Sequence, residues 1–126
     1  MRVFWISLVI ICIFIIFSIY YTYILEKSSG NIVTSIEDIE KKIDKNDWDG
    51  VQKDLDILRN KWEGMIKPWS SFIEHEELDN IQVSILKVDE YISMNNEVLT
   101  RSELSVLKYL VRHIYLKEKL ELGNIF

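Results

Sequence analysis

The sequence has little of what enzymes and small secreted domains usually depend on. Its 126 residues include one cysteine, one proline, four glycines and no alanine. The lone Cys12 cannot form a disulfide within the chain, which excludes a disulfide-stabilised miniprotein. Four glycines are too few for a phosphate-binding loop, and no Gly-x-Ser-x-Gly nucleophile motif is present. We therefore predict a protein that is not an enzyme.

Positive charge is also scarce. The chain has 15 lysines and arginines against 20 aspartates and glutamates, a net charge of −5. After residue 25 the balance is 14 basic against 20 acidic residues, or −6. Nucleic-acid binding requires basic residues that neutralise phosphates, and no basic stripe with interleaved aromatic residues is present. We expect no nucleic-acid partner.

Hydrophobic residues are concentrated in one segment. From Val3 to Leu25, 20 of 23 residues are hydrophobic and none is charged, whereas the other 103 residues contain 41 hydrophobic ones. As a helix this segment would be about 34 Å long, enough to cross a hydrocarbon core of about 30 Å. Trp5 and several tyrosines lie near its two ends, as at membrane interfaces. We predict a transmembrane anchor with short flanks at residues 1–27, in contact with the lipid bilayer through residues 3–25.

Other interpretations of this segment fit less well. A cleaved signal peptide has a small-residue cleavage site after its apolar region, and no such site follows Leu25. A lipoprotein signal would use Cys12, but the bulky Ile11 precedes it where a small residue is needed. The positive-inside rule gives a weak signal, because Arg2 is the only charged side chain before the segment. We favour a single-pass cell-membrane protein with a cytoplasmic N-terminus and an extracytoplasmic domain.

The remaining residues, 28–126, have the apolar spacing of helices. Four seams have apolar residues three and four positions apart, namely Ile32 to Ile43, Trp48 to Met65, Leu78 to Ile92 and Leu104 to Ile114. The predicted fold class is all-α: a transmembrane helix followed by an antiparallel bundle of two helical hairpins, about four helices. A shift of 49 residues superimposes the two predicted hairpins. This match indicates either a duplication or the coincidence of seven heptads.

Local signals predict the first helix boundaries of the domain. A linker is expected at residues 28–31, because Ser-Ser-Gly-Asn interrupts the apolar pattern. Thr34 and Glu37 have the spacing of a capping box near the start of the first seam. Asn46 or Asp47 is expected to cap the helix that follows the next turn.

Proline and glycine predict the later boundaries. Pro68 would clash with the carbonyl of Gly64, so we expect a break or kink there. The last helix is expected to begin near Glu97, or at the Thr100–Glu103 capping box if it starts late. Gly123-Asn124 is expected to end it.

The densest polar cluster is Glu74-His75-Glu76-Glu77, followed by Asp79. Because histidine and carboxylates bind zinc and iron, His75, Glu76 and Asp79 form the alternative metal set. The spacing argues against it, since a zincin needs a second histidine where Asp79 stands and a di-iron bundle needs a glutamate where Phe72 stands. Acidic residues more commonly mark a helix start. We expect no metal and no other cofactor.

The tryptophans fall into two groups. Trp48 and Trp62 lie on the second seam and are expected in the core. Trp69 follows the proline, off the regular seam, and is predicted to be an exposed, partner-binding aromatic. Other apolar residues lie off the main seams and either widen the core or form a partner surface: Val83, Leu86, Val106 and Tyr109.

These residues also carry a resemblance. The Asn46-Asp47-Trp48 turn, Trp62, Trp69, the His75-Glu76 pair and Asp79-Asn80 make nearly the whole chain similar to the domain of unknown function 4363 family. The resemblance implies a small membrane-anchored protein of low-GC Gram-positive, often spore-forming bacteria, with an all-helical extracytoplasmic domain. It implies no activity. The pair His75-Glu76 is expected to cap the third helix and hydrogen-bond to the second.

The predicted function is a non-enzymatic interaction or assembly module at the cell envelope, with a protein partner whose identity the sequence does not give. The first alternative is a metal-binding enzyme or sensor that uses His75, Glu76 and Asp79. The second is a ligand-binding module with a pocket around Trp69.

Overall fold

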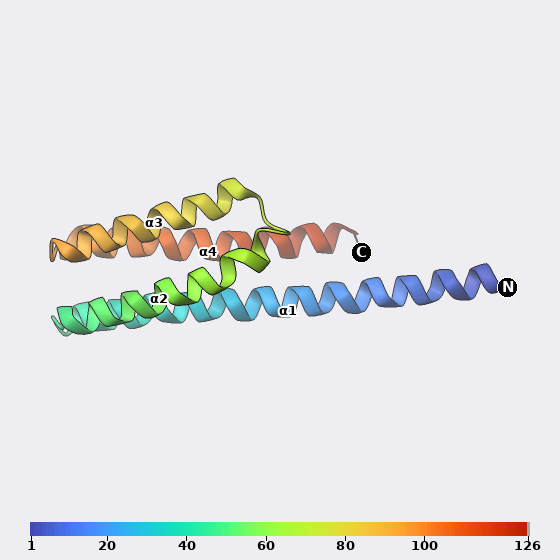
Figure 1. Ribbon diagram of the computed structural model, residues 1–126, viewed down its shortest axis with the longest axis horizontal. Coiled ribbons are helices and arrows are strands. Elements are labelled where there is room, and N and C mark those ends of the chain that lie inside the picture. Colours follow the sequence, from blue (N-terminus) through green and yellow to red (C-terminus); the bar gives the residue numbers. More distant parts are fainter. Residues whose placement is uncertain (126) are drawn as a thin grey trace.

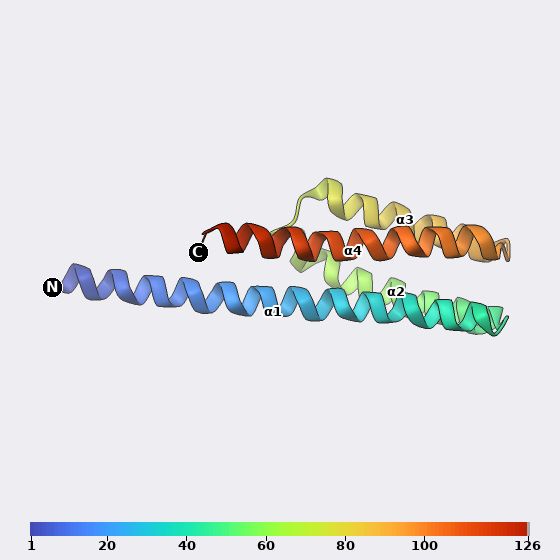
Figure 2. The same cartoon turned by 180° about the vertical axis from the view of Figure 1, so that it is seen from behind.

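The computed structural model describes residues 1–125, and this part of the chain contains helices and no strand. The helices are α1 (Arg2–Asp44), α2 (Trp48–Trp69), α3 (His75–Ser93) and α4 (Glu97–Ile125). The predicted all-α class is confirmed. α1 packs on α2 and α4, α3 packs on α4, and α2 and α3 share a smaller contact. In both views the N-terminal part of α1 projects beyond the other helices (Figures 1 and 2).

α1 is one continuous helix of 43 residues, so the predicted linker at residues 28–31 is wrong. Ser29 is buried between Leu25 and Ile32 on the face that packs against the bundle. This packing offsets the cost of about 1 kcal/mol for the helical Gly30 relative to alanine. The bundle-facing positions of α1 are spaced alternately four and three residues apart: Ser18, Thr22, Leu25, Ser29, Ile32, Ile36, Ile39 and Ile43.

The first capping predictions have mixed outcomes. Thr34 and Glu37 lie inside α1, so they form no capping box, and the Thr34 hydroxyl donates to the carbonyl of Gly30 at 2.9 Å. The cap of α2 is confirmed, because the Asp47 carboxylate accepts from the N–H of Gly50 at 3.0 Å.

The α1–α2 and α3–α4 turns have the same geometry. Asn46 and Asn95 both have left-handed backbone angles, with φ of 56° and 50°. Asp47 and Asn96 follow them, and the Oδ1 of each accepts a hydrogen bond of 3.0 Å from the N–H three residues later. The turns are offset by 49 residues. Their agreement extends beyond apolar positions, which seven heptads alone would match.

α2 runs through Pro68 and ends at Trp69, so the break predicted at Gly64 to Pro68 is wrong. Pro68 is the second-last helical residue. Its missing N–H frees only the carbonyl of Gly64, and because Gly64 is exposed, water can bind that carbonyl. The buried Trp69 holds the last turn in place.

α4 begins at Glu97, as predicted, and the late start at Thr100–Glu103 is wrong. Thr100 is buried inside the helix, and its hydroxyl donates to the carbonyl of Asn96 at 2.6 Å. The helix continues to Ile125, beyond the end predicted at Gly123-Asn124. An open helix terminus can include a glycine, because glycine lowers helix stability without blocking the backbone hydrogen bonds.

The four predicted seams form the core. Every residue of these seams is buried except Trp48, Met65 and Leu110, which are half-buried. Trp62 is a large, fully buried side chain of this core, and its indole Nε1 donates to Oε1 of Gln82 on α3 at 2.7 Å. Burial of each large apolar side chain stabilises the fold by about 1.5–3 kcal/mol. The spacing argument therefore located the core correctly.

Candidate functional site

The alternative metal residues lie at the start of α3. His75, Glu76 and Asp79 are all exposed, and the described residues contain no group of three or more His, Cys, Asp or Glu side chains placed to hold a metal ion. α3 begins after Glu74. Within residues 1–125, no side chain caps this end, and neither His75 nor Glu76 hydrogen-bonds to α2. The cap and cross-helix bond expected of the pair are therefore not formed.

The fold brings the acidic cluster to His113, which the sequence did not predict. A surface cavity of about 370 Å³ between α3 and α4 is lined by Glu74, Glu76, Glu77, Asn80, Tyr109, Leu110, His113 and Ile114. The rings of Tyr109 and His113 stack with centroids 5.7 Å apart. No local spacing signals this cavity, because it depends on how α3 and α4 pair.

Lys117 balances the acidic side of this cavity. Its amine donates to Glu77 at 3.1 Å and lies 3.6 Å from Glu74, and the hydrogen bond to Glu77 raises the pKa of Lys117. A lysine beside the carboxylates opposes the binding of a metal cation there. No observation favours the metal alternative.

Trp69 is only 6% exposed, so the predicted exposure of this aromatic is wrong. Because α2 continues through Pro68, Trp69 lies two turns after Trp62 on the same face. The two rings meet edge to face with centroids 6.2 Å apart. The exposed aromatic is instead Phe72, 56% exposed, in the connector between α2 and α3. A partner-binding role for Trp69 stays a prediction.

The off-seam apolar residues do not widen the core. Val83 and Leu86 on α3 and Val106 and Tyr109 on α4 are exposed. On α4 they belong to a longer exposed seam with three-four spacing, made of Val106, Tyr109, His113, Leu116 and Leu120. We call this set the outer seam of α4. Its spacing was readable in the sequence, two positions away from the core seam.

A second region of interest is the junction, where the apolar half of α1 meets the rest of the bundle. It comprises Phe17–Leu25 of α1, Pro68–Phe72 of α2 and the connector, and Glu118–Gly123 of α4. The Phe72 ring lies 6.5 Å from the ring of Phe17 and 5.0 Å from that of Tyr21, between centroids. An apolar cavity of about 180 Å³ is lined by Phe17, Tyr20, Tyr21, Ile24, Leu25, Pro68, Trp69 and Phe72.

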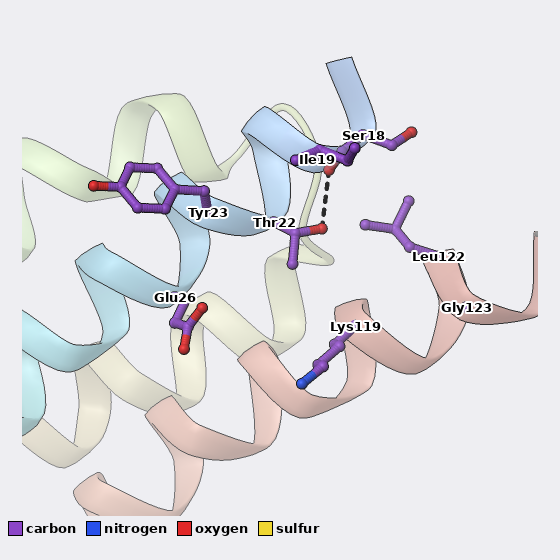
Figure 3. Close-up of a pocket in the computed structure, with 8 residues that line it drawn as sticks. All are labelled: Ser18, Ile19, Thr22, Tyr23, Glu26, Lys119, Leu122 and Gly123. Atoms are coloured by element: carbon purple, nitrogen blue, oxygen red, sulfur yellow. Dashed lines mark hydrogen bonds between the residues drawn. The ribbon is translucent and has the colours of Figure 1, made fainter. Parts of the chain in front are cut away.

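The other side of the junction is more polar. Figure 3 shows a cavity of about 410 Å³ between Ser18, Ile19, Thr22, Tyr23 and Glu26 of α1 and Lys119, Leu122 and Gly123 of α4. The Thr22 hydroxyl donates to the carbonyl of Ser18 at 2.9 Å, so this polar group is satisfied within the helix. Burial, and then the nearby Glu121 and Glu77, raise the pKa of Glu118.

The comparison with known families agrees with the extent of the bundle. The model of Domain of unknown function (DUF4363) matches residues 19–125. The chain belongs to this family. The match begins one residue after Ser18, the first buried residue of α1. No curated protein and no solved structure matches the chain. The predicted family is therefore confirmed, and it supplies no activity.

In this DUF4363 chain the apolar residues of α1 extend beyond the matched domain. Within the described residues, α1 is the one helix long and apolar enough to cross a membrane, and almost all of its apolar window is exposed. Length and composition fit a membrane anchor or a signal sequence.

Proposed function

We propose that the chain is a single-pass membrane protein whose helical domain is a non-enzymatic interaction or assembly module at the cell envelope. Residues 3–25 lie in the lipid bilayer, the N-terminus is cytoplasmic, and the domain from residue 28 onward is extracytoplasmic. The family resemblance, to small membrane-anchored proteins of low-GC Gram-positive bacteria, supports this proposal.

The surface of α1 supports the anchor. Every large hydrophobic side chain from Val3 to Phe17 is at least 39% exposed. Soluble monomers rarely leave a continuous apolar patch larger than a few hundred Å² in water. Lipid chains would cover this surface without a polar cost, because the backbone of α1 is hydrogen-bonded within the helix.

The outer seam of α4 carries the interaction proposal. Apolar residues three and four positions apart are the pattern by which one helix packs on another. α4 already uses one such seam, Leu104 to Ile114, in the core. A second seam from Val106 to Leu120 on the exposed side fits a helix of a partner protein.

The arrangement of the bundle fits a rigid module. We propose that α1 with α2, and α3 with α4, form two antiparallel hairpins. The matching Asn46 and Asn95 turns and the contacts within each helix pair support this arrangement. Lys108 of α4 pairs with Glu40 of α1 at 2.9 Å and links the two hairpins.

Site-specific photocrosslinking in the native membrane tests the interaction proposal. A benzoylphenylalanine probe at Leu116 should give one discrete protein adduct. The same probe at Gln52, exposed on α2, should give none. Val106→Ser with Leu120→Ser should abolish the adduct without loss of helicity, because both side chains are exposed. Equal adducts from Leu116 and Gln52, or an adduct that survives the double substitution, would refute a role for the outer seam.

A further inference from the structure

The freely exposed apolar part of α1 is too short to cross a bilayer alone. It runs from Val3 to Phe17, which is about 22 Å of helix, against a hydrocarbon core of about 30 Å. The next turns, from Ser18 to Leu25, complete the predicted span but pack against the bundle. If α1 crosses the membrane in this structure, the junction must lie at the edge of the bilayer.

The tyrosines of α1 place the membrane interface at the same level. Tyr20 and Tyr23 are exposed, and tyrosine rings are enriched at the headgroup layer. Tyr21, between them, contacts Phe72 of the connector. Tyr23 lines the same cavity as Leu122 of α4 (Figure 3). The length of the helix and the position of its tyrosines therefore agree.

We propose that the bundle itself contacts the bilayer, with Phe72 of the connector and Leu120 of α4 inserted into the interfacial layer. This inference rests on the proposed membrane anchor. Both side chains are exposed at the junction, where they extend the apolar surface of α1 sideways. The apolar cavity beside Phe72 is lined by residues of both α1 and the connector, so lipid chains around α1 can reach it.

The charges at the junction indicate which lipids are needed. Lys67 and Lys119 lie near the acidic Glu118 and Glu121. Attraction to anionic lipid requires an excess of basic residues, which the junction does not have. Apolar insertion therefore drives this contact, and it forms on a neutral bilayer. Because α1 continues through Ser29 without a flexible linker, the contact follows from insertion of the helix.

Spin labels on the full chain test the proposal in phosphatidylcholine vesicles. Cys12→Ser removes the one native thiol, and single cysteines are then placed at Ile10, Phe72, Leu120 and Met94. Ile10 reports the anchor. Phe72 and Leu120 report the junction. Met94 is an exposed control in the α3–α4 turn, at the end of the bundle far from the N-terminus (Figure 1). The measurement is the ratio of collisions with oxygen to collisions with a water-soluble nickel chelate.

The ratio should be highest at Ile10, several-fold above the Met94 value at Phe72 and Leu120, and unchanged when phosphatidylglycerol is added. If either junction label matches Met94 while Ile10 remains in lipid, the bundle contact is wrong and the anchor stands. A junction ratio that rises only with phosphatidylglycerol would also overturn the proposal, because charge would then drive the contact. If Ile10 itself is in water, the anchor and the bundle contact both fail.

Discussion

The rings of Tyr21 on α1 and Phe72 in the α2–α3 connector lie 5.0 Å apart between centroids, inclined at 53°. Tyr21 belongs to the segment predicted to cross the membrane, and Phe72 belongs to the bundle. Leu25 is similarly shared, since it lies in the predicted span and is only 2% exposed within the core. The packing of the bundle thus extends from residue 28 back to Ser18, and α1 transmits the position of the membrane to the bundle without a hinge.

Leu25→Ala tests this packing. The substitution should lower the free energy of unfolding by about 2–5 kcal/mol, because it removes a buried side chain and leaves a cavity. Ile24→Ala, at the neighbouring and exposed position, should cost about 1 kcal/mol or less. Denaturant unfolding of the full chain in detergent micelles measures both. Equal losses for the two variants would show that Leu25 is not a core residue.

Ser29→Ala should stabilise the protein. Within the described residues, the buried Ser29 hydroxyl has no hydrogen-bond partner, and burying such a group costs about 1–3 kcal/mol. Alanine removes that cost and favours the helix. Ser28→Ala, next to it and only half-buried, should change the unfolding midpoint much less. A lower midpoint for Ser29→Ala would mean that the hydroxyl makes a stabilising bond.

The tight turns require residues that tolerate left-handed backbone angles. Asn95→Ala should destabilise the fold by about 1–2 kcal/mol, because a Cβ without a polar group is unfavourable at φ of 50°. Asn95→Gly should be close to the natural protein. At Asn46 glycine should cost more than at Asn95, because Asn46 Oδ1 accepts from the indole of Trp48 at 3.1 Å. Thermal unfolding of these variants checks the order, and similar values for Asn95→Ala and Asn95→Gly would count against it.

Glu118 should make stability depend on pH. Its pKa is raised in the folded state, so the folded protein binds a proton more readily than the unfolded chain. Stability from this group therefore increases as pH falls through the raised pKa, until the unfolded chain is protonated as well. Glu118→Gln should raise the unfolding midpoint at pH 7, with an advantage that shrinks towards pH ~4. Glu63→Gln, exposed on α2, is the control, and a pH-independent advantage at Glu118 would contradict the account.

The sequence located the core well because the core side chains are apolar. Ile32 to Ile43 and the other three seams follow the three-four rule, which detects apolar residues. The same rule missed the first half of the α1 seam, because Ser18, Thr22 and Ser29 are polar and were counted as interruptions. Small polar residues can occupy such positions where two helices approach closely, so their spacing was the available signal.

Other features depend on how the helices pair and have no local signal. The hydrogen bond from Lys117 to Glu77 joins residues 40 positions apart, and it forms only because α3 and α4 are antiparallel in this register. Pro68 was expected to break α2, but its position at the last turn removes little hydrogen bonding. The exposure of Trp69 was predicted from that same break, so one wrong boundary produced both errors.

The most direct test of the account asks whether α1 crosses the membrane with the bundle outside the cell. Met94→Cys in the Cys12→Ser background places one exposed thiol at the end of the bundle far from α1's N-terminus. Intact cells are treated with a membrane-impermeant maleimide, and their membranes are then washed with alkaline carbonate. The account predicts a protein that is labelled before lysis and stays in the washed membrane pellet. Release into the soluble fraction, or labelling only after lysis, would contradict it.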